Sequence, residues 1–252
     1  MNPGPGRVTQ DYFSGVAADY ARHRPGYPAA LFDWLAARTP EHDLAWDCGC
    51  GNGQASLSLA ERYRRVAATD FSARQIELAT PHARIEYRAA PAEASGLPAH
   101  CADLVTVAQA LHWFDFDRFY AEVRRVLKPD GLFAAWTYRL LRAEPAINDI
   151  LGDFYTNTLG PYWPPERRWV DLGYDGGMPF PFREVATPSF EIRLEWSLDD
   201  LLAYLGTWSA TARYRQTTGR DPIPALGERL VPAWPGGTRE IIWPIAMRAG
   251  HV

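Results

Sequence analysis

The stretch Asp47-Cys48-Gly49-Cys50-Gly51-Asn52-Gly53 carries three glycines at alternate positions. It follows the apolar run Leu44-Ala45-Trp46, which predicts a buried strand, and it precedes residues 54–60, which predict a helix. A strand, a glycine turn and a helix bring backbone amides close to a ligand, because glycine has no Cβ to keep the ligand away. We therefore expect a nucleotide-like cofactor at the carboxyl end of this first strand.

Two acidic residues frame the turn and favour one kind of cofactor. Asp47 ends the first strand, and Asp70 ends a second predicted strand, 17 residues after Gly53. The dinucleotide fingerprint is G-x-G-x-x-G, whereas this chain has G-x-G-x-G preceded by an acid that would repel a pyrophosphate. A cationic amine or sulfonium would be attracted instead, and Asp70 stands close to the spacing at which an acid accepts hydrogen bonds from ribose hydroxyls.

Asp47, the three glycines and Asp70 resemble motif I and the following acidic motif of class I S-adenosylmethionine-dependent methyltransferases. Residues 90–98 resemble the family segment beside the adenine, residues 103–114 its fourth strand and the loop after it, and residues 123–131 the helix and turn before its fifth strand. The run Ala-Leu-His-Trp-Phe at 110–114, with residues 20–28 and 243–247, is similar to the type 11 branch, and in particular to bacterial relatives of trans-aconitate methyltransferase. The resemblance is strong to Tyr138 and looser beyond it.

This resemblance implies S-adenosyl-L-methionine as the cofactor and S-adenosyl-L-homocysteine as the product. The residues at the matching positions, expected to bind the cofactor, are Asp47, Gly49, Cys50, Gly51, Gly53, Asp70, Phe71, Ala92, Glu93, Gln109 and Arg24. Asp70 would bind the ribose, and Arg24 would bind the methionine carboxylate, whose geometry a guanidinium matches. Asp47 would hold the methionine amino group, orient the glycine turn through backbone amides, or do both. The family usually has an acid two residues before Glu93, but this chain has Pro91, so the adenine amino group has no assigned side chain.

The order of predicted elements indicates an α/β fold. Helices are expected at 28–38, 54–62, 72–79 and 115–127, and strands at 44–48, 65–70, 85–88, 103–109 and 132–138. Strands that alternate with helices imply a parallel, doubly wound sheet. We expect a Rossmann-like, mostly parallel sheet of seven strands, in which Phe190–Trp196 and Glu240–Met247 pair antiparallel at one edge, as in class I methyltransferases.

Four regions follow from this pattern. We expect a flexible tail at 1–10, a cofactor-binding core at 11–138, a cap that forms the substrate region at 139–230, and a C-terminal edge strand at 231–252. Within the cap, residues 146–158 predict a helix, Ser197 predicts a helix start with an N-cap and a helix that reaches about Trp208, and residues 223–230 predict a further short helix. Helices and loops of the cap are expected to lie over the active site.

Candidate catalytic and substrate residues come from the loop after the fourth strand, from the cap and from the N-terminal segment. His112 could act as a general base at neutral pH, or it could shape the pocket together with Trp113. Tyr20 could cover the methyl group, or it could pack on a helix. Seven of the ten tryptophans stand at or after Trp136, and a tryptophan ring offers a flat face for stacking. We therefore expect a small, planar acceptor, which is bound by Trp113, Trp163, Trp169 and Trp208. An acidic acceptor is expected if an arginine in or beside the cap points inward, and the candidates are Arg139, Arg142, Arg167, Arg168, Arg213 and Arg215.

Charge, apolar runs and cysteine usage limit the kinds of partner that the protein is expected to bind. A net charge of −4 argues against a nucleic-acid-binding face, and no apolar run reaches membrane-spanning length. Three cysteines without framework spacing suit a reducing cytoplasm, and Cys48 and Cys50 lack a second ligand pair, so no metal site is expected. We expect a cytoplasmic monomer or homodimer that transfers a methyl group to an oxygen or nitrogen by in-line displacement. An NAD-dependent oxidoreductase and a non-catalytic cofactor-binding protein stay open as alternatives.

Overall fold

Five parallel strands form the centre of the computed structural model, which describes residues 25–252. They are β1 (Leu44–Cys48), β2 (Arg65–Asp70), β3 (Ile85–Ala89), β4 (Ala102–Ala108) and β5 (Leu127–Tyr138), and they lie side by side in the order β3-β2-β1-β4-β5. The chain order reverses direction between β1 and β4, which places a ligand-binding crevice at the carboxyl ends of these two strands. Tyr20, Arg24 and the predicted tail at 1–10 lie outside the described residues.

An antiparallel edge completes the sheet. β8 (Arg239–His251) pairs with β5 along one side and with β7 (Phe190–Trp196) and β6 (Arg183–Val185) along the other. The predicted α/β class and the predicted pairing of Phe190–Trp196 with Glu240–Met247 are therefore confirmed. The sheet has eight strands in the described part instead of the predicted seven. The extra strand, β6, has three residues, which is too short to show the alternation by which strands are recognised.

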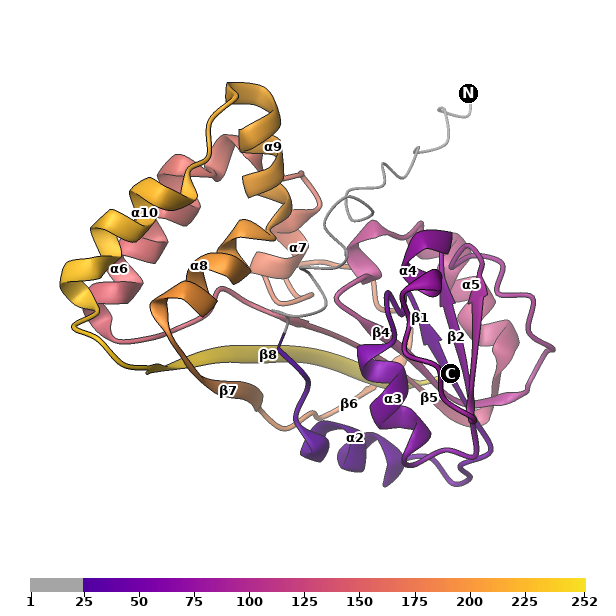
Figure 1. Ribbon diagram of the computed structural model, residues 1–252. Coiled ribbons are helices and arrows are strands. Elements are labelled where there is room, and N and C mark those ends of the chain that lie inside the picture. Colours follow the sequence, from indigo (N-terminus) through magenta and orange to yellow (C-terminus); the bar gives the residue numbers. More distant parts are fainter. Residues whose placement is uncertain (1–24) are drawn as a thin grey trace.

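Helices cover both faces of the parallel strands, as a doubly wound sheet requires (Figure 1). α2 (Ala29–Ala36) and α3 (Gln54–Ala60) pack on one face, where their apolar side chains join those of Ala45, Leu104 and Leu132. α5 (Phe116–Val126) packs on the opposite face, against Trp46, Val105 and Phe133. α4 (Ala73–Glu77) follows β2, and Ser72 caps it as predicted, since its hydroxyl accepts from the Gln75 amide.

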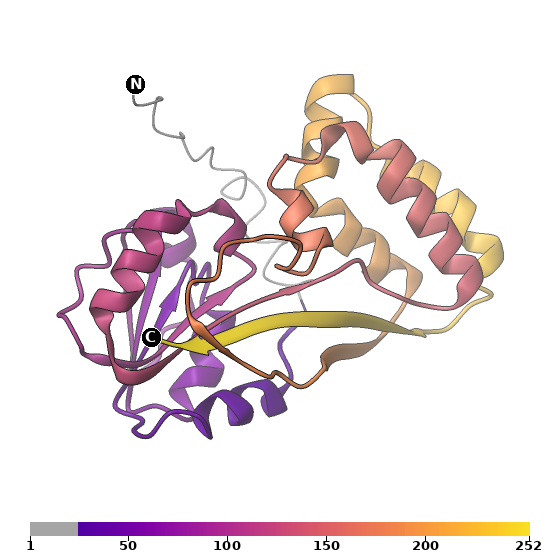
Figure 2. The ribbon, with the colours of Figure 1, turned by 180° about the vertical axis from the view of Figure 1, so that it is seen from behind.

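The helices after β5 gather into a second lobe at the far end of the long β5–β8 ribbon (Figures 1 and 2). These helices are α6 (Pro145–Asp153), α8 (Leu198–Gly206), α9 (Ser209–Thr218) and α10 (Ile223–Leu230), with a π-helix at Phe154–Thr158 and single 3₁₀ turns at Gly160–Tyr162 and Val231–Ala233. α7 (Arg167–Asp171) lies where this lobe meets the sheet, since Val170 joins the apolar cluster around α5. Ser197 caps α8 as predicted, in a reciprocal capping box with Asp200. The helix expected to reach Trp208 ends at Gly206, and α9 follows after a short break.

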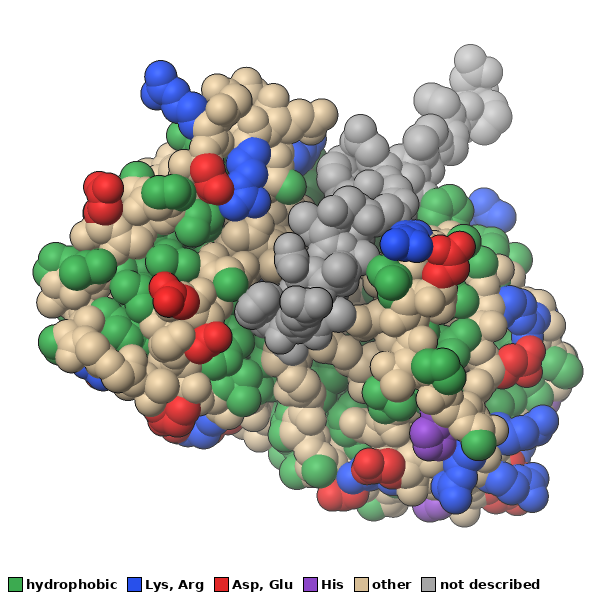
Figure 3. Space-filling model, viewed as in Figure 1, with side chains coloured by type: hydrophobic (Ala, Val, Ile, Leu, Met, Phe, Trp, Pro, Cys, Tyr) green, Lys and Arg blue, Asp and Glu red, His purple; other side chains and the backbone are tan. Residues whose placement is uncertain are grey.

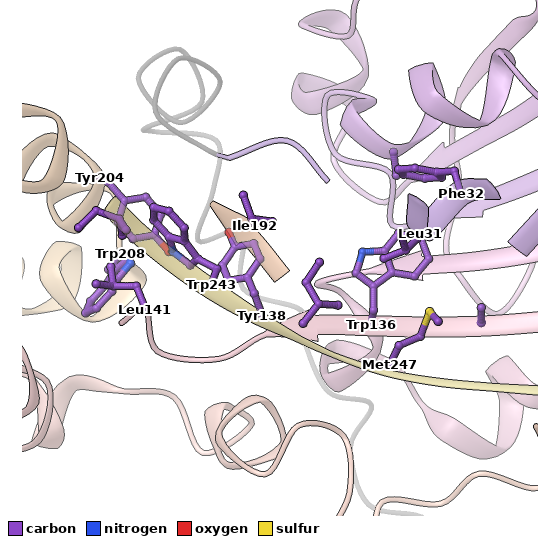
Figure 4. Packing of buried hydrophobic residues seen from close by; sticks show 14 of the residues in the cluster. Leu31, Phe32, Trp136, Tyr138, Leu141, Ile192, Tyr204, Trp208, Trp243 and Met247 are labelled. Atoms are coloured by element: carbon purple, nitrogen blue, oxygen red, sulfur yellow. The ribbon is translucent and has the colours of Figure 1, made fainter. Parts of the chain in front are cut away.

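A single apolar cluster runs along β5 and β8 from the parallel sheet into the helical lobe (Figure 4). Phe32, Trp136 and Met247 lie at the sheet end of this cluster, and Tyr204, Trp208 and Trp243 lie at the helical end. Tyr204 also accepts a hydrogen bond from the Trp243 indole at 3.2 Å. Because dense packing resists small displacements, this shared core sets the position of the helical lobe relative to the sheet.

The surface carries charges of both signs. On the face shown in Figure 3, acidic and basic side chains lie close to one another over both lobes. Within residues 25–252, no helix combines the length and the apolar character that crossing a bilayer requires.

Candidate functional site

The three glycines of the opening stretch adopt left-handed backbone conformations, with φ of +68° at Gly49, +56° at Gly51 and +91° at Gly53. They differ in what surrounds them. A Cβ on Gly49 would overlap Ala110 and crowd the Phe114 ring, and a Cβ on Gly53 would overlap the Tyr87 hydroxyl. A Cβ on Gly51 would meet nothing closer than Gln75 Oε1, at 4.0 Å. Gly49 and Gly53 are thus required by protein packing, whereas Gly51 faces open space that a ligand can fill.

Asp70 lies directly beside this open position. Its Oδ2 accepts a hydrogen bond from the Gly51 amide at 2.8 Å, and its Oδ1 accepts one from the Ser72 amide at 2.8 Å. The next residue, Phe71, is 64% exposed although it is a large apolar side chain. A carboxylate fixed beside a glycine backbone, next to an uncovered aromatic ring, fits a nucleoside whose ribose binds the acid and whose base contacts the ring. Both contacts stay predictions.

Asp47 is fully buried beneath the glycine turn. One carboxylate oxygen accepts from the Ser56 hydroxyl at 2.6 Å, and the other accepts from the Thr106 hydroxyl at 3.0 Å. Burial raises the pKa of Asp47 to about 6, although both hydroxyls act in the opposite direction. The structure therefore ties Asp47 to α3 and β4 through side-chain hydroxyls. The expected contact of Asp47 with the methionine amino group is not tested.

The other predicted cofactor residues surround the same turn. Cys50 and Ala92 are buried, and Glu93 Oε1 accepts a hydrogen bond from the Asp115 amide at 3.1 Å. Glu93 thereby ties the predicted adenine segment to the start of α5. Pro91 is exposed. The side chain that would bind the adenine amino group stays unassigned.

A partly open cavity lies between the carboxyl end of the sheet and the helical lobe. The sheet side contributes Gln109, His112, Trp113, Tyr138, Arg139 and Leu140. The helical lobe contributes Trp163, Pro164, Arg167, Val170, Tyr204, Trp208 and Ser209. The loop after β4 forms part of this wall and also contacts Gly49, so the cavity and the glycine turn share residues 109–114.

The four tryptophans expected to bind the acceptor do not all lie at the cavity. Trp113, Trp163 and Trp208 line the cavity, and Trp163 and Trp208 lie with ring centroids 5.4 Å apart. Trp169 does not line it, because its ring packs edge-on against Phe116 at 6.2 Å. Its neighbours in the helix, Arg167 and Val170, do line the cavity, so Trp169 points to another side of the helix, and the sequence carries no sign of this orientation.

The charged groups in the lining are all cationic. The described lining contains Arg139 and Arg167 and no aspartate or glutamate. Arg139 donates to the Leu172 carbonyl at 3.2 Å, and no carboxylate of the described chain lies within ion-pair distance of it. Arg167 lies 4.6 Å from the centre of the Trp163 ring, and Asp171, outside the lining, is 3.2 Å from its Nε. This wall therefore favours an anion or a hydrogen-bond acceptor.

His112 is buried at the base of the cavity, where its Nδ1 lies 3.1 Å from the Tyr174 hydroxyl. Burial, together with the nearby Arg167, lowers the pKa of His112 to about 3. The imidazole is thus neutral at physiological pH, and it is a weak base. This placement favours the expectation that His112 shapes the pocket over the expectation that it acts as a general base.

Several residues of the site were not predicted. Tyr138 and Tyr204 line the cavity, and Thr137 and Tyr174 support it from behind. Tyr138 could have been found, since it ends a predicted strand at the carboxyl edge of the sheet, where ligands bind. Tyr174 and Tyr204 come from distant parts of the chain and carry no local signal.

Comparisons with known proteins agree with this geometry. A family model described as a methyltransferase domain, type 11, matches residues 46–135. A protein of Dictyostelium discoideum named as a methyltransferase is 33% identical over 89% of this chain and 86% of its own. A Saccharomyces cerevisiae protein named as an S-adenosylmethionine-dependent methyltransferase is 27% identical, and the match covers 64% of this chain and 60% of that protein.

Solved structures extend the match. The structure of a type II methyltransferase from Anaeromyxobacter dehalogenans superimposes with a TM-score of 0.84 and 48% identity, and covers 90% of this chain and 97% of that one. A methyltransferase structure from Anabaena variabilis shares the fold, with a TM-score of 0.56 and 18% identity over 88% of this chain and 98% of that one. The finer resemblance to relatives of trans-aconitate methyltransferase stays a prediction, while the oxidoreductase alternative for the glycine turn finds no support. The glycine turn, the acid at the end of β2, the sheet order and these relatives show that the chain belongs to the class I S-adenosylmethionine-dependent methyltransferases.

Proposed function

We propose that this methyltransferase transfers the methyl group of S-adenosyl-L-methionine to an oxygen or nitrogen of a small, planar, acidic molecule. The observation that carries the proposal is the composition of the cavity, whose described walls combine aromatic rings with two arginines and contain no carboxylate. Aromatic walls favour a flat ligand by stacking. Guanidinium groups favour a negatively charged ligand, especially where aromatic rings exclude water.

The cofactor would lie on the sheet side of the site. Asp70 would bind the ribose hydroxyls, the Gly51 backbone would permit close approach, and the exposed ring of Phe71 would contact the adenine. When bound, S-adenosyl-L-methionine supplies an electrophilic methyl group. The residues 109–114 separate this position from the cavity and contribute to both, so the methyl group and the acceptor would meet at this loop.

The chain's own residues would act by positioning. Trp163 and Trp208 would hold the plane of the acceptor, and Arg139 and Arg167 would fix its anionic group. A carboxylate attacks without losing a proton, so a cavity whose histidine is neutral and weakly basic is sufficient for this acceptor. The acceleration would then come from alignment and from exclusion of water.

Calorimetry of the purified protein with S-adenosyl-L-methionine, S-adenosyl-L-homocysteine and NAD tests the cofactor. We expect the first two to bind and NAD not to bind, and we expect Asp70→Ala to lower the affinity for both by at least about tenfold, as loss of hydrogen bonds to a charged group does. Binding of NAD alone would overturn the proposal.

Incubation with methyl-labelled cofactor and a panel of carboxylic acids, phenols and heterocyclic amines tests the acceptor. We expect label in the carboxylic acids first. If the cofactor binds and no member of the panel is labelled, the alternative of a protein that binds the cofactor without turnover is favoured instead.

A further inference from the structure

The side chain of Gln109 has one satisfied and one unsatisfied end. Its Oε1 accepts a hydrogen bond from the Thr137 hydroxyl at 2.9 Å. Its Nε2 is buried and has no hydrogen-bond partner within the described chain. Leaving a buried donor unpaired is costly, so native proteins rarely do so without a functional reason. Gln109 lines the cavity. Its Nε2 has almost no exposed surface, so a small rotation of the side-chain amide would bring this donor to a ligand that supplies the missing acceptor.

The backbone of Gln109 is also unusual. Its φ is +61°, in the left-handed region that side chains other than glycine seldom adopt. The backbone N–H of Gln109 donates to the Trp136 carbonyl at 2.9 Å, and this hydrogen bond continues the pairing of β4 with β5 by one residue. This conformation turns the side chain out of the strand pattern at the carboxyl edge of the sheet. Strained residues of this kind cluster at ligand-binding sites.

A buried chain of polar groups holds the Gln109 amide in place. Thr137 is fully buried and hydrogen-bonds to both Gln109 and the Tyr174 hydroxyl. Tyr174 is also fully buried, and its hydroxyl lies 3.1 Å from His112 Nδ1. Because each member contacts the next, the side-chain amide is held at the cavity wall, so only a small reorganisation would precede ligand binding.

The ligand that suits this amide follows from the groups around it. Gln109 Nε2 and the guanidinium groups of Arg139 and Arg167 can only donate hydrogen bonds. Among them only Arg167 has a carboxylate partner in the described chain, Asp171, which lies outside the lining. We propose that Gln109 is a specificity-determining residue whose Nε2 donates to a carboxylate oxygen of the acceptor. This assignment rests on the proposed function, and it differs from the expectation that Gln109 contacts the methionine part of the cofactor.

Binding of a planar carboxylate probe tests the assignment. Calorimetry in the presence of S-adenosyl-L-homocysteine would compare trans-cinnamate with cinnamyl alcohol, which has the same ring and chain but no charge. We expect the wild-type protein to bind trans-cinnamate at least about tenfold more tightly than the alcohol, since hydrogen bonds to charged groups exceed neutral ones.

Substitution of the amide then isolates Gln109. Gln109→Met retains the length of the side chain and removes the donor, and we expect it to weaken trans-cinnamate binding about tenfold while affinity for S-adenosyl-L-homocysteine stays within about twofold. Thr137→Val, which releases Oε1, should weaken trans-cinnamate binding by a smaller factor. Gln216→Met on the exposed face of α9 makes the same chemical change away from the cavity and should leave both affinities unchanged.

The outcomes separate this inference from the proposed function. If the wild-type protein does not bind S-adenosyl-L-homocysteine, the proposed function fails. If it binds that ligand but does not prefer trans-cinnamate over the alcohol, or if Gln109→Met binds trans-cinnamate as tightly as wild type, the role of Gln109 is overturned. A variant that loses cofactor affinity and retains trans-cinnamate affinity would assign Gln109 to the cofactor.

Discussion

At the scale of single residues, the glycine turn separates packing from binding. Gly53 lacks a Cβ because Tyr87 lies against it, whereas Gly51 lacks one beside open space. Both have positive φ, so each substitution by alanine carries backbone strain of about 1–3 kcal/mol. Only Gly53→Ala adds an overlap with a neighbouring side chain.

We therefore expect Gly53→Ala to lower the free energy of unfolding by about 1–3 kcal/mol more than Gly51→Ala does, because overpacking adds to the strain. Chemical denaturation of the two variants measures this difference. Gly51→Ala should instead show the larger loss of S-adenosyl-L-methionine affinity by calorimetry. Equal stability of the two variants would contradict the packing role assigned to Tyr87.

Asp47 gives a prediction about pH. Burial raises its pKa to about 6, so the folded state binds a proton more tightly than the unfolded state does. Its contribution to stability is thus fully present below about pH 4 and is lost as the pH rises through 6. A shift of roughly two pKa units corresponds to about 3 kcal/mol. We expect the stability of wild type relative to Asp47→Asn to fall by this amount between pH 4 and pH 7. Denaturant titrations of both proteins across this range measure the effect, and a parallel pH dependence of the two would contradict it.

His112 gives a prediction about rate. Because its pKa is lowered to about 3, its protonation state does not change between pH 6 and pH 9. Methyl transfer to a carboxylic acid should therefore be independent of pH in this range. Initial rates with labelled cofactor test this, with His112→Asn as the matched variant. A rate limb near neutral pH that disappears in His112→Asn would instead identify His112 as a general base.

At the scale of elements, one lysine joins three strands at the edge of the sheet opposite the site. Lys128, at the start of β5, lies 2.7 Å from Asp103 at the start of β4. Asp103 is 2% exposed and accepts from the amides of Asp43 and Leu44, where β1 begins. Lys128 is the lone lysine of the chain. Its role is structural, and it depends on strand neighbours that are distant in sequence.

We expect Lys128→Met to lower the free energy of unfolding by about 2–4 kcal/mol, because it leaves the Asp103 carboxylate buried without its cation. Lys128→Arg should restore most of the loss. Thermal or chemical unfolding would show the difference, and both variants should bind S-adenosyl-L-homocysteine as wild type does. A Lys128→Met protein as stable as wild type would show that the two strand amides alone satisfy Asp103.

At the scale of the whole molecule, the residues expected to bind the cofactor and those expected to bind the acceptor lie mainly in different lobes. The glycine turn and Asp70 belong to the parallel sheet, whereas Trp163, Arg167 and Trp208 belong to the helical lobe, which the β5–β8 ribbon and the shared core hold in place (Figures 1 and 4). Substitutions in the helical lobe should therefore affect the acceptor more than the cofactor.

Two tryptophans of the helical lobe form a matched pair for this test. We expect Trp163→Ala to weaken trans-cinnamate binding about tenfold, since loss of a stacked ring in a binding cavity costs roughly 1–2 kcal/mol. Trp169→Ala, whose ring packs on Phe116 outside the cavity, should leave that affinity within about twofold of wild type. Neither should change affinity for S-adenosyl-L-homocysteine. Equal effects of the two would show that the cavity does not bind the acceptor.

The sequence by itself determined the parallel sheet and the family. The glycines at 49, 51 and 53, Asp70 and the alternation of strands with helices are local signals, and each can be recognised within a few residues. The antiparallel edge was also predictable, because Phe190–Trp196 alternates clearly. The short strand β6 and the break between α8 and α9 could not be predicted, because segments of two or three residues are too short to show a repeating pattern of apolar and polar side chains.

The tertiary structure alone decided which side chains meet in the cavity. The side chains of Gln109, Thr137 and Tyr174 are linked by hydrogen bonds, although 65 residues separate the first from the last. Likewise, Trp169 points away from the cavity although Arg167 and Val170 on the same short helix, α7, line it. Packing against distant elements decides which face of so short a helix is buried, and the local sequence does not encode this choice. The sequence thus established the cofactor turn, whereas packing of the two lobes determined the shape and charge of the acceptor site.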